Sequence, residues 1–317
     1  MGGKMTFFNL IIILIILVPF LLFVFPNLII AVILYRLLLV RTSKKKWSRK
    51  CSKLKGKEQL EMFSRGIQWM NENKVSMTHV SINNKGLNLY GEYFNFGFNK
   101  AVIIIAGRSE GCLYSCYYAK PYKDYGYNIL VIDNRCNGLS DGKYLSFGIN
   151  EYTDILLWGK FLHEKYAINS VILHGICTGA ATALNTLTSE NLPLYFKGMI
   201  ADGMYSTFYD VFRNHIISFK QPVFPVLQIV FFMIKHISKV DAKNNGPVYC
   251  IQNLQKPILF IHSKQDKYSL PSEIKSIYEK CHSPKNIVWF EKGEHSHIRI
   301  NNEKKYDQSI IDFLKQC

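Results

Sequence analysis

The chain has 317 residues, of which 48% are apolar, 14% aromatic and 20% charged, and eight are cysteines. This length fits one large domain or two small ones, the apolar content excludes a wholly disordered chain, and cysteines this sparse exclude a disulfide scaffold. The net charge of +16 does not indicate nucleic-acid binding, because the single segment 41–57, which has no acidic residue, supplies +9 of it.

The N-terminal segment is typical of a membrane span. Residues 5–35 are 31 consecutive uncharged residues, nearly all of them apolar. As a continuous helix they would extend about 46 Å, whereas the hydrocarbon core of a bilayer is about 30 Å thick. This is more than one span and too little for two. Pro19 and Pro26 suggest a kink, with residues 7–25 crossing the membrane and residues 27–40 running along or near the interface.

A cleaved signal peptide is the alternative to an anchor. Its apolar region would have about 7–15 residues and would end at a small-residue site, so we expect residues 1–40 to stay as an uncleaved anchor. One lysine precedes the apolar segment, and nine basic residues follow it within residues 41–57. The positive-inside rule therefore predicts a single pass through the cell membrane, with the catalytic domain in the cytoplasm and the basic residues on anionic headgroups. In that reducing compartment we expect all eight cysteines to be unpaired.

The chain after the anchor divides into a linker and a larger domain. Residues 41–74 are the basic juxtamembrane segment and a linker helix, in which Leu60, Phe63, Ile67 and Met70 have helical spacing. Residues 75–317 begin with a hairpin that turns at 83–86. Apolar runs typical of buried strands follow at 101–106, 128–132, 170–173, 198–200, 257–261 and 286–290. Helical stretches lie at 151–166, 179–188, 271–281 and 303–314.

This alternation predicts an α/β fold with a mostly parallel sheet covered on both faces. The apolar, helix-like segment 206–245, which contains Pro222 and Pro225, interrupts the alternation. It is either a cap over the edge of the sheet or a pair of core helices.

The segment after the third buried run carries a candidate nucleophile. Residues 175–181, GICTGAA, have the G-x-S-x-G spacing of a nucleophile elbow, with Cys177 in the serine position. In so tight a strand-to-helix turn, the residues two before and two after the nucleophile must be small, which explains Gly175 and Gly179. The nucleophile then stands at a helix N-terminus, where the dipole and the N–H groups favour a thiolate. A buried, inert cysteine is the alternative for the motif alone, but the strand before it and the helix after it favour the nucleophile.

With this elbow, the chain resembles the α/β-hydrolase superfamily over residues 75–317. It is most similar to the membrane-anchored bacterial hydrolases described as serine-aminopeptidase-like. Residues 133–142, DNRCNGLSDG, match that family's pattern D-x-R-x-x-G-x-S-x-G, and Phe147, Gly148, Glu151 and Asp154 follow at the expected offsets. The resemblance implies an α/β-hydrolase fold with a mostly parallel central sheet flanked by helices and a helical cap at about 206–245.

The resemblance also implies two catalytic partners for Cys177. The family's acid follows the next-to-last strand, where this chain has Asp266, and its base follows the last strand, where His295 has a G-x-H-like position. The order Cys177, Asp266, His295 is the superfamily's order of nucleophile, acid and base. Three other titratable residues are expected outside the catalytic set: Asp202 is a structural acid, His297 a surface residue and His174 a strand-end residue.

In these roles Cys177 attacks a carbonyl carbon, His295 moves protons, and Asp266 fixes the histidine tautomer. We expect the backbone N–H groups of Arg108 and Thr178 to form the oxyanion hole. The Arg108 side chain either meets an acidic group of the substrate or is solvated. No cofactor and no metal are expected, since the chain has no C-x-x-C pair and no H-E-x-x-H string.

Two departures from the family pattern bear on the reaction. Cysteine replaces serine at position 177, and Ala106-Gly107 replaces the family's His-Gly. A thiolate attacks thioesters and activated esters well, whereas amide cleavage needs a protonated leaving group, so a peptidase is less favoured.

The sequence therefore favours a membrane-anchored hydrolase of ester or thioester bonds, acting on a small or amphiphilic acyl substrate at the lipid bilayer. The alternatives are a catalytically silent membrane binding or scaffold protein, and an acyltransferase with the same triad. Neither a nucleic acid nor an obligate protein partner is expected.

Overall fold

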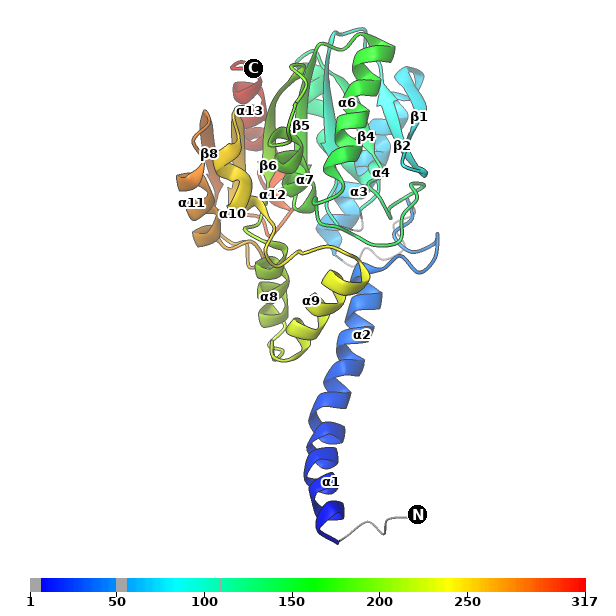
Figure 1. Cartoon of the computed structure of the whole chain (residues 1–317). Helices are drawn as coiled ribbons and strands as arrows, with labels where there is room; N and C mark the ends of the chain where they lie inside the picture. Colours follow the sequence, from blue (N-terminus) through cyan, green and yellow to red (C-terminus); the bar gives the residue numbers. More distant parts are fainter. Residues whose placement is uncertain (1–6, 50–55, 109) are drawn as a thin grey trace.

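The computed structural model describes residues 7–49, 56–108 and 110–317. Within these ranges the chain folds around one eight-stranded sheet of order β1-β2-β4-β3-β5-β6-β7-β8 (Figure 1). The pairs β1–β2 and β2–β4 are antiparallel, and the other neighbours are parallel. This confirms the predicted α/β-hydrolase fold. The strands are β1 (Met77–Asn84), β2 (Leu87–Phe94), β3 (Lys100–Ile105), β4 (Asn128–Ile132), β5 (Ser170–Ile176), β6 (Phe196–Asp202), β7 (Ile258–Ser263) and β8 (Lys285–Phe290).

Local sequence explains the hairpin and the buried strands. Lys85 and Gly86 form the β1–β2 turn with φ values of 50° and 86°, the positive values that a two-residue hairpin turn needs. Strands β4 and β5 bury every residue, because helices cover both of their faces. Along β3, Ile103 and Ile105 belong to one core cluster, whereas Val102 and Ile104 belong to the other.

Helices pack on both faces of the sheet (Figure 1). One face carries α6 (Tyr152–Tyr166), α7 (Thr178–Leu187), α10 (Pro247–Cys250) and α11 (Pro271–Lys280). The other carries α3 (Lys57–Glu72), α4 (Cys112–Ser115), α5 (Lys120–Asp124) and α13 (Glu303–Leu314). Shorter elements are η2 (Lys74–Ser76), η3 (Cys116–Tyr118), η4 (Ile251–Asn253) and α12 (Ile298–Asn301).

The linker helix α3 forms as predicted. Met62, Gly66 and Trp69 are buried, and Phe63 and Met70 of the predicted apolar stripe pack against the same core cluster, whereas Leu60 is 50% exposed. A Cβ at Gly66 would lie 2.8 Å from the Leu113 carbonyl oxygen. The glycine therefore lets the helix approach the backbone of α4 closely.

The N-terminal segment is helical throughout its described length and lacks the predicted change of direction (Figure 1). Helix α1 (Phe7–Pro19) continues through a π-helical turn, η1 (Phe20–Val24), into α2 (Phe25–Leu39). The wider π turn lies between the two prolines, each of which lacks a backbone N–H donor and so interrupts the regular helical hydrogen bonds. Among the described residues one helix, Leu14–Leu39, is long and apolar enough for a membrane span or a signal sequence, with a mean hydropathy of 2.7.

The segment predicted as a cap or a core pair lies beyond the carboxyl ends of the strands, and not on a face of the sheet. It forms α8 (Phe208–Ser218) and α9 (Val226–Ile237), which point away from the sheet beside α2 (Figure 1). A third apolar cluster joins these helices to Ala31, Tyr35 and Leu39 of α2. The N-terminal helix and the cap are thus packed together.

Candidate active site

Cys177 lies at the turn between β5 and α7. Its φ and ψ are 52° and −110°, a strained combination for a residue with a side chain. A Cβ at Gly175 would lie 2.3 Å from the Gly179 carbonyl oxygen, and a Cβ at Gly179 would lie 2.0 Å from the Ile105 carbonyl oxygen. Both glycines are therefore required by close backbone contacts. The geometry is that of a nucleophile elbow.

Asp266 and His295 meet beside this elbow, from the loops after β7 and β8. His295 Nδ1 lies 2.7 Å from Asp266 Oδ2, and the Asp266 side chain is fully buried. The other carboxylate oxygen, Oδ1, accepts the N–H groups of Tyr268 and Ser269, each at 2.9 Å. These bonds fix the carboxylate, which in turn fixes the orientation of the imidazole.

The second nitrogen of His295 faces the cavity that Cys177 lines. Nε2 is buried and makes no hydrogen bond of ordinary geometry within the described ranges, to Cys177 or to any other residue. A buried polar atom without a partner is rare in folded proteins and marks a position where a ligand or a reacting group is expected.

Charges around His295 favour its protonated form. Burial lowers the pKa of His295, but the negative charges of Asp266 and of a Cys177 thiolate outweigh burial and hold that pKa well above its ordinary value. Burial raises the pKa of Asp266, but the charge and hydrogen bond of His295 bring it below the ordinary value. The two side chains therefore form an ion pair at neutral pH.

The other candidates lie where the sequence prediction put them, outside this set. Asp202 is fully buried, its Oδ2 accepts the Tyr306 hydroxyl at 2.6 Å, and burial raises its pKa to about 7. His174 lies between two tyrosine hydroxyls, and burial lowers its pKa to about 3. His297 is partly exposed, and its Nδ1 lies 3.2 Å from Glu58 Oε2 on the linker helix. None of the three contacts Asp266 in place of His295.

Arg108 and Thr178 both line the cavity beside Cys177. Thr178 is the first residue of α7, a position whose N–H has no partner within the helix. The Arg108 side chain donates from Nη1 to the carbonyl oxygen of Leu38 at 3.2 Å, and contact with an acidic group of a substrate stays a prediction. That carbonyl belongs to the last turn of α2, where the unpaired C=O groups attract a cation.

Glu110 is a cavity residue that the sequence prediction missed. Its Oε2 accepts the Gly107 N–H at 3.2 Å, and it shares the cavity with Cys177 and His295. Burial raises the pKa of Glu110 to about 7, although the Gly107 hydrogen bond and the charges of His295 and Arg108 oppose this rise. The only sequence signal is its place three residues after the Ala106-Gly107 pair.

The loop of residues 133–142 binds the juxtamembrane segment. Asp133 Oδ2 accepts the Arg49 Nε at 2.6 Å, and Arg49 also pairs with the buried Glu92. Arg41 donates to the carbonyl oxygens of Gly138 and Ser140, each at 2.6 Å. The prediction that the basic residues lie on headgroups is therefore wrong for Arg41 and Arg49. Residues 50–55 of the basic segment lie outside the described residues.

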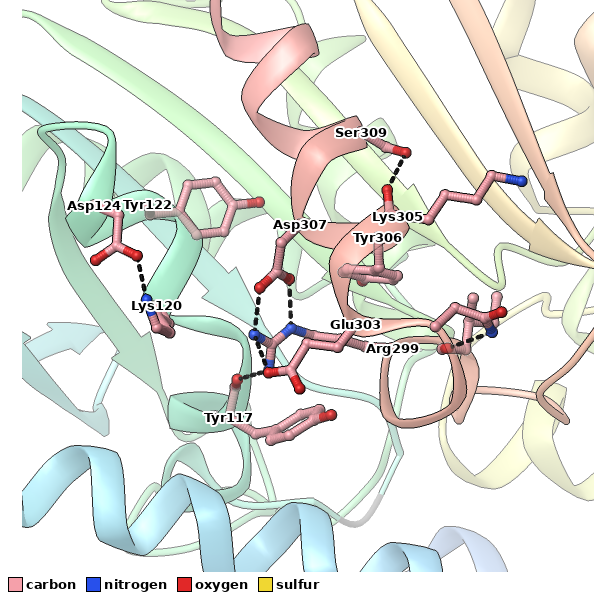
Figure 2. A network of polar contacts seen from close by, with 12 residues as sticks. Tyr117, Lys120, Tyr122, Asp124, Arg299, Glu303, Lys305, Tyr306, Asp307 and Ser309 are labelled. Atoms are coloured by element: carbon pink, nitrogen blue, oxygen red, sulfur yellow. Dashed lines mark hydrogen bonds and ion pairs between the residues drawn. The ribbon is translucent and has the colours of Figure 1, made fainter.

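The loop that carries His295 is held to the domain from behind by Arg299, which is only 2% exposed. Its guanidinium donates to both carboxylate oxygens of Asp307 at 2.7 Å and to the Tyr117 carbonyl oxygen at 2.7 Å (Figure 2). Tyr118 adds a bond from its hydroxyl to the Ser296 carbonyl oxygen at 3.2 Å. These contacts fix the loop that carries His295.

The cavity measures about 200 Å³ and has an apolar wall. That wall comes from the cap helix α8, through Phe208, Val211 and Phe212, with His215 beside them.

Seven of the eight cysteines are described and all seven are free, as predicted, while Cys51 lies outside the described residues. Within the described ranges no cluster of His, Cys, Asp or Glu could hold a metal ion.

The comparisons with known proteins agree with this geometry. No family model matches the chain. Over 218 residues it is 32% identical to the uncharacterized protein YqkD of Bacillus subtilis, covering 67% of this chain and 70% of YqkD.

Similar solved structures include the Pyrococcus furiosus esterase PF2001, with a TM-score of 0.65 and 20% identity over 78% of this chain and 93% of the esterase. The esterase EaEST of Exiguobacterium antarcticum has a TM-score of 0.58 and 16% identity, over 75% of this chain and 100% of that one. The acylaminoacyl peptidase of Pyrococcus horikoshii has a TM-score of 0.57 and 19% identity, over 75% of this chain and 41% of the peptidase. The chain belongs to one family with YqkD, and it has the α/β-hydrolase fold that these esterases and the peptidase share.

Proposed function

We propose that the protein is a membrane-anchored hydrolase that cleaves ester or thioester bonds, with Cys177 as nucleophile, His295 as base and Asp266 as acid. One observation carries this proposal. The 2.7 Å bond between His295 Nδ1 and Asp266 Oδ2 leaves Nε2 buried and unpartnered in the cavity of Cys177. A histidine with a purely structural role would use both nitrogens, as His174 does.

In the proposed reaction, the Cys177 thiolate forms a bond to the carbonyl carbon of the substrate and pushes an electron pair onto the carbonyl oxygen. The N–H groups of Arg108 and Thr178 stabilise that oxyanion. When the oxyanion collapses, the bond to the leaving oxygen or sulfur breaks and His295 Nε2 supplies its proton. Water then attacks the thioester and gives a proton to Nε2, and the second collapse releases a carboxylic acid and restores the thiolate.

The site favours acyl groups with good leaving groups. A preformed thiolate reacts well with esters and thioesters, whereas an amine must be protonated before it leaves. The apolar wall of Phe208, Val211 and Phe212 suits a hydrocarbon acyl chain. The esterase names of two similar structures support this choice over a peptidase, although an acylaminoacyl peptidase shares the fold.

The packing of α2 supports an uncleaved anchor. A cleaved signal sequence would remove Ala31, Tyr35 and Leu39 from the cluster they form with the cap. It would also remove the Leu38 carbonyl that Arg108 binds. The basic residues after the span and the free cysteines support a cytoplasmic catalytic domain.

The test uses the full-length chain in detergent micelles with short activated esters, acyl-coenzyme A thioesters and long-chain lipid esters. We expect hydrolysis of at least one class and an acyl group on Cys177, located by peptide mass spectrometry after rapid acid quenching. Cys177→Ala is the control and is expected to show neither. Acylation without release by water, but with release by an added alcohol, would indicate an acyltransferase. No acylation by any class would contradict the proposal and favour a silent binding protein.

A further inference from the structure

The α8–α9 hairpin exposes an apolar surface that a water-soluble cap does not need. Ile217, Phe219, Phe224 and Phe232 are 46%, 60%, 69% and 63% exposed. Residues 214–234 contain a single formally charged residue, Lys220. Contiguous exposed apolar surface of this kind marks a site that contacts a membrane or a partner.

The position of this hairpin beside α2 favours a membrane over a protein partner as the surface it contacts. Helix α9 contacts α2, and Tyr35 Oη lies 2.8 Å from Ser238 Oγ just after the end of α9. The hairpin and α2 extend from the same end of the molecule, side by side (Figure 1). A bilayer that surrounds α2 at the depth of Ala31 therefore also meets the hairpin.

The length of the N-terminal helix allows this depth. Helical residues 7–39 extend about 50 Å, which exceeds the hydrocarbon core by about 20 Å. A span of about twenty residues that ends just before Arg36, the first charged residue after the apolar segment, includes Ala31 and Tyr35. Since these are the residues packed on the cap, this position of the span also removes the apolar surface of the hairpin from water.

Charges border the apolar surface as they would at a headgroup layer. Arg213 precedes it in α8, and Lys235 and Lys239 follow it, all three with exposed side chains. Basic residues in such a position attract anionic headgroups. An aqueous protein partner would have no reason to match the depth of α2.

The hairpin also forms the wall of the active-site cavity. Helix α8 contributes Val211 and Phe212 to the cavity, and its exposed end begins at Ile217, little more than one turn later. A hydrocarbon chain leaving the bilayer along α8 would thus stay on apolar surface until its carbonyl reached Cys177.

We infer that the α8–α9 hairpin inserts into the leaflet from which α2 emerges, and that the cavity takes long-chain acyl esters or thioesters of that leaflet directly from the bilayer. The inferred insertion is argued from the exposed apolar surface of the hairpin and from its packing against α2, whereas the substrate class rests on the proposed function. The two parts are therefore tested by different measurements.

Insertion is tested on the full-length chain in vesicles whose acyl chains carry bromine, a contact quencher of tryptophan fluorescence. The variants are Phe224→Trp and Phe232→Trp. The matched control is Leu194→Trp, because Leu194 is 81% exposed and lies just before β6, at the amino ends of the parallel strands and so at the opposite end of the sheet from the hairpin. After subtraction of the wild-type signal, we expect bromine to quench the added fluorescence at least twofold in the hairpin variants and not in the control. Equal fluorescence with and without bromine at both hairpin positions would overturn the insertion.

Substrate entry is tested with Phe224→Asp and Phe232→Asp. We expect at least a tenfold loss in hydrolysis of a long-chain ester held in vesicles, and less than a twofold change with a short water-soluble ester. Leu194→Asp should change neither. An equal loss with both esters would overturn entry from the bilayer. A wild-type chain that hydrolyses neither ester would contradict the proposed function, while the quenching experiment would still decide the insertion.

Discussion

Asp266→Asn is the substitution that tests the electrostatics of the candidate site most directly. It keeps the shape of the side chain and removes the charge that lies 2.7 Å from His295 Nδ1. Burial then becomes the dominant influence on the imidazole and lowers the pKa of His295. The imidazole of His295 is therefore expected to lose its positive charge beside Cys177 in the variant.

The size of the effect follows from the bond that is changed. Hydrogen bonds to charged groups contribute about 1.5–3 kcal/mol, against about 1 kcal/mol for neutral ones. Asp266→Asn replaces the charged bond by a neutral one, a loss of about 0.5–2 kcal/mol, and at 1.36 kcal/mol per factor of ten this lowers the population of the ion pair about 2- to 30-fold. A cysteine without such a pair reacts only as the pH approaches about 8.5.

The assay is alkylation of Cys177 by iodoacetamide between pH 5 and 9, followed by peptide mass spectrometry to separate this residue from the other cysteines. In the wild-type chain, we expect rapid alkylation already at pH 6. In Asp266→Asn, the rate at pH 6 is expected to fall about 2- to 30-fold and to recover toward pH 9. Identical rates at pH 6 in the two chains would refute the argument that Asp266 maintains the ion pair.

Three further substitutions test other parts of the site. Cys177→Ala is expected to lower ester hydrolysis by at least about 10³-fold. The midpoint of urea unfolding should stay nearly unchanged, since this half-buried side chain fills little core volume. Hydrolysis near the wild-type rate would place the chemistry elsewhere. Gly179→Ala is expected to destabilise the chain by about 1–3 kcal/mol in urea unfolding, because the added Cβ would lie 2.0 Å from the Ile105 carbonyl oxygen; a wild-type midpoint would show that the elbow relaxes freely. Glu110 has a pKa of about 7 in the folded chain, against an ordinary value of 4.5, so rising pH between these values favours the unfolded state of the wild type. Glu110→Gln should therefore gain stability relative to wild type from pH 5 to pH 8, and a constant difference would contradict the raised pKa.

The sequence could predict the sheet and the three central residues because strong local constraints encode them. Strands buried on both faces need continuous apolar runs, and the elbow needs Gly175 and Gly179 for backbone contacts of 2.0–2.3 Å. The resemblance to the family then placed Asp266 and His295 after neighbouring strands, where side chains at the carboxyl ends converge. In the structure these two side chains lie 2.7 Å apart.

Other features depend on contacts between distant segments, which no local pattern records. The full burial of Met62, Gly66 and Trp69 on α3 depends on the close approach of Gly66 to the Leu113 backbone, which the apolar stripe alone does not indicate. The path of the N-terminal helix depends on a π turn and on packing against the cap. Glu110 has no motif of its own and becomes notable only once the fold brings it beside His295.

The juxtamembrane contacts bear on which form of the protein is active. Arg49 lies between the carboxylates of Asp133 and Glu92, both of which are buried. Asp133 also accepts the Cys112 N–H at 2.8 Å, and this bond ties the loop after β3 to the loop after β4. A fragment that began at the linker helix would leave both carboxylates without their arginine, and removing one partner of a buried pair costs about 3–5 kcal/mol. It would also remove the last turn of α2, which holds the side chain of Arg108. The residue proposed for the oxyanion hole is thus positioned by the anchor itself, so the N-terminal helix is part of the active-site architecture and the full-length chain is the unit whose chemistry has to be measured.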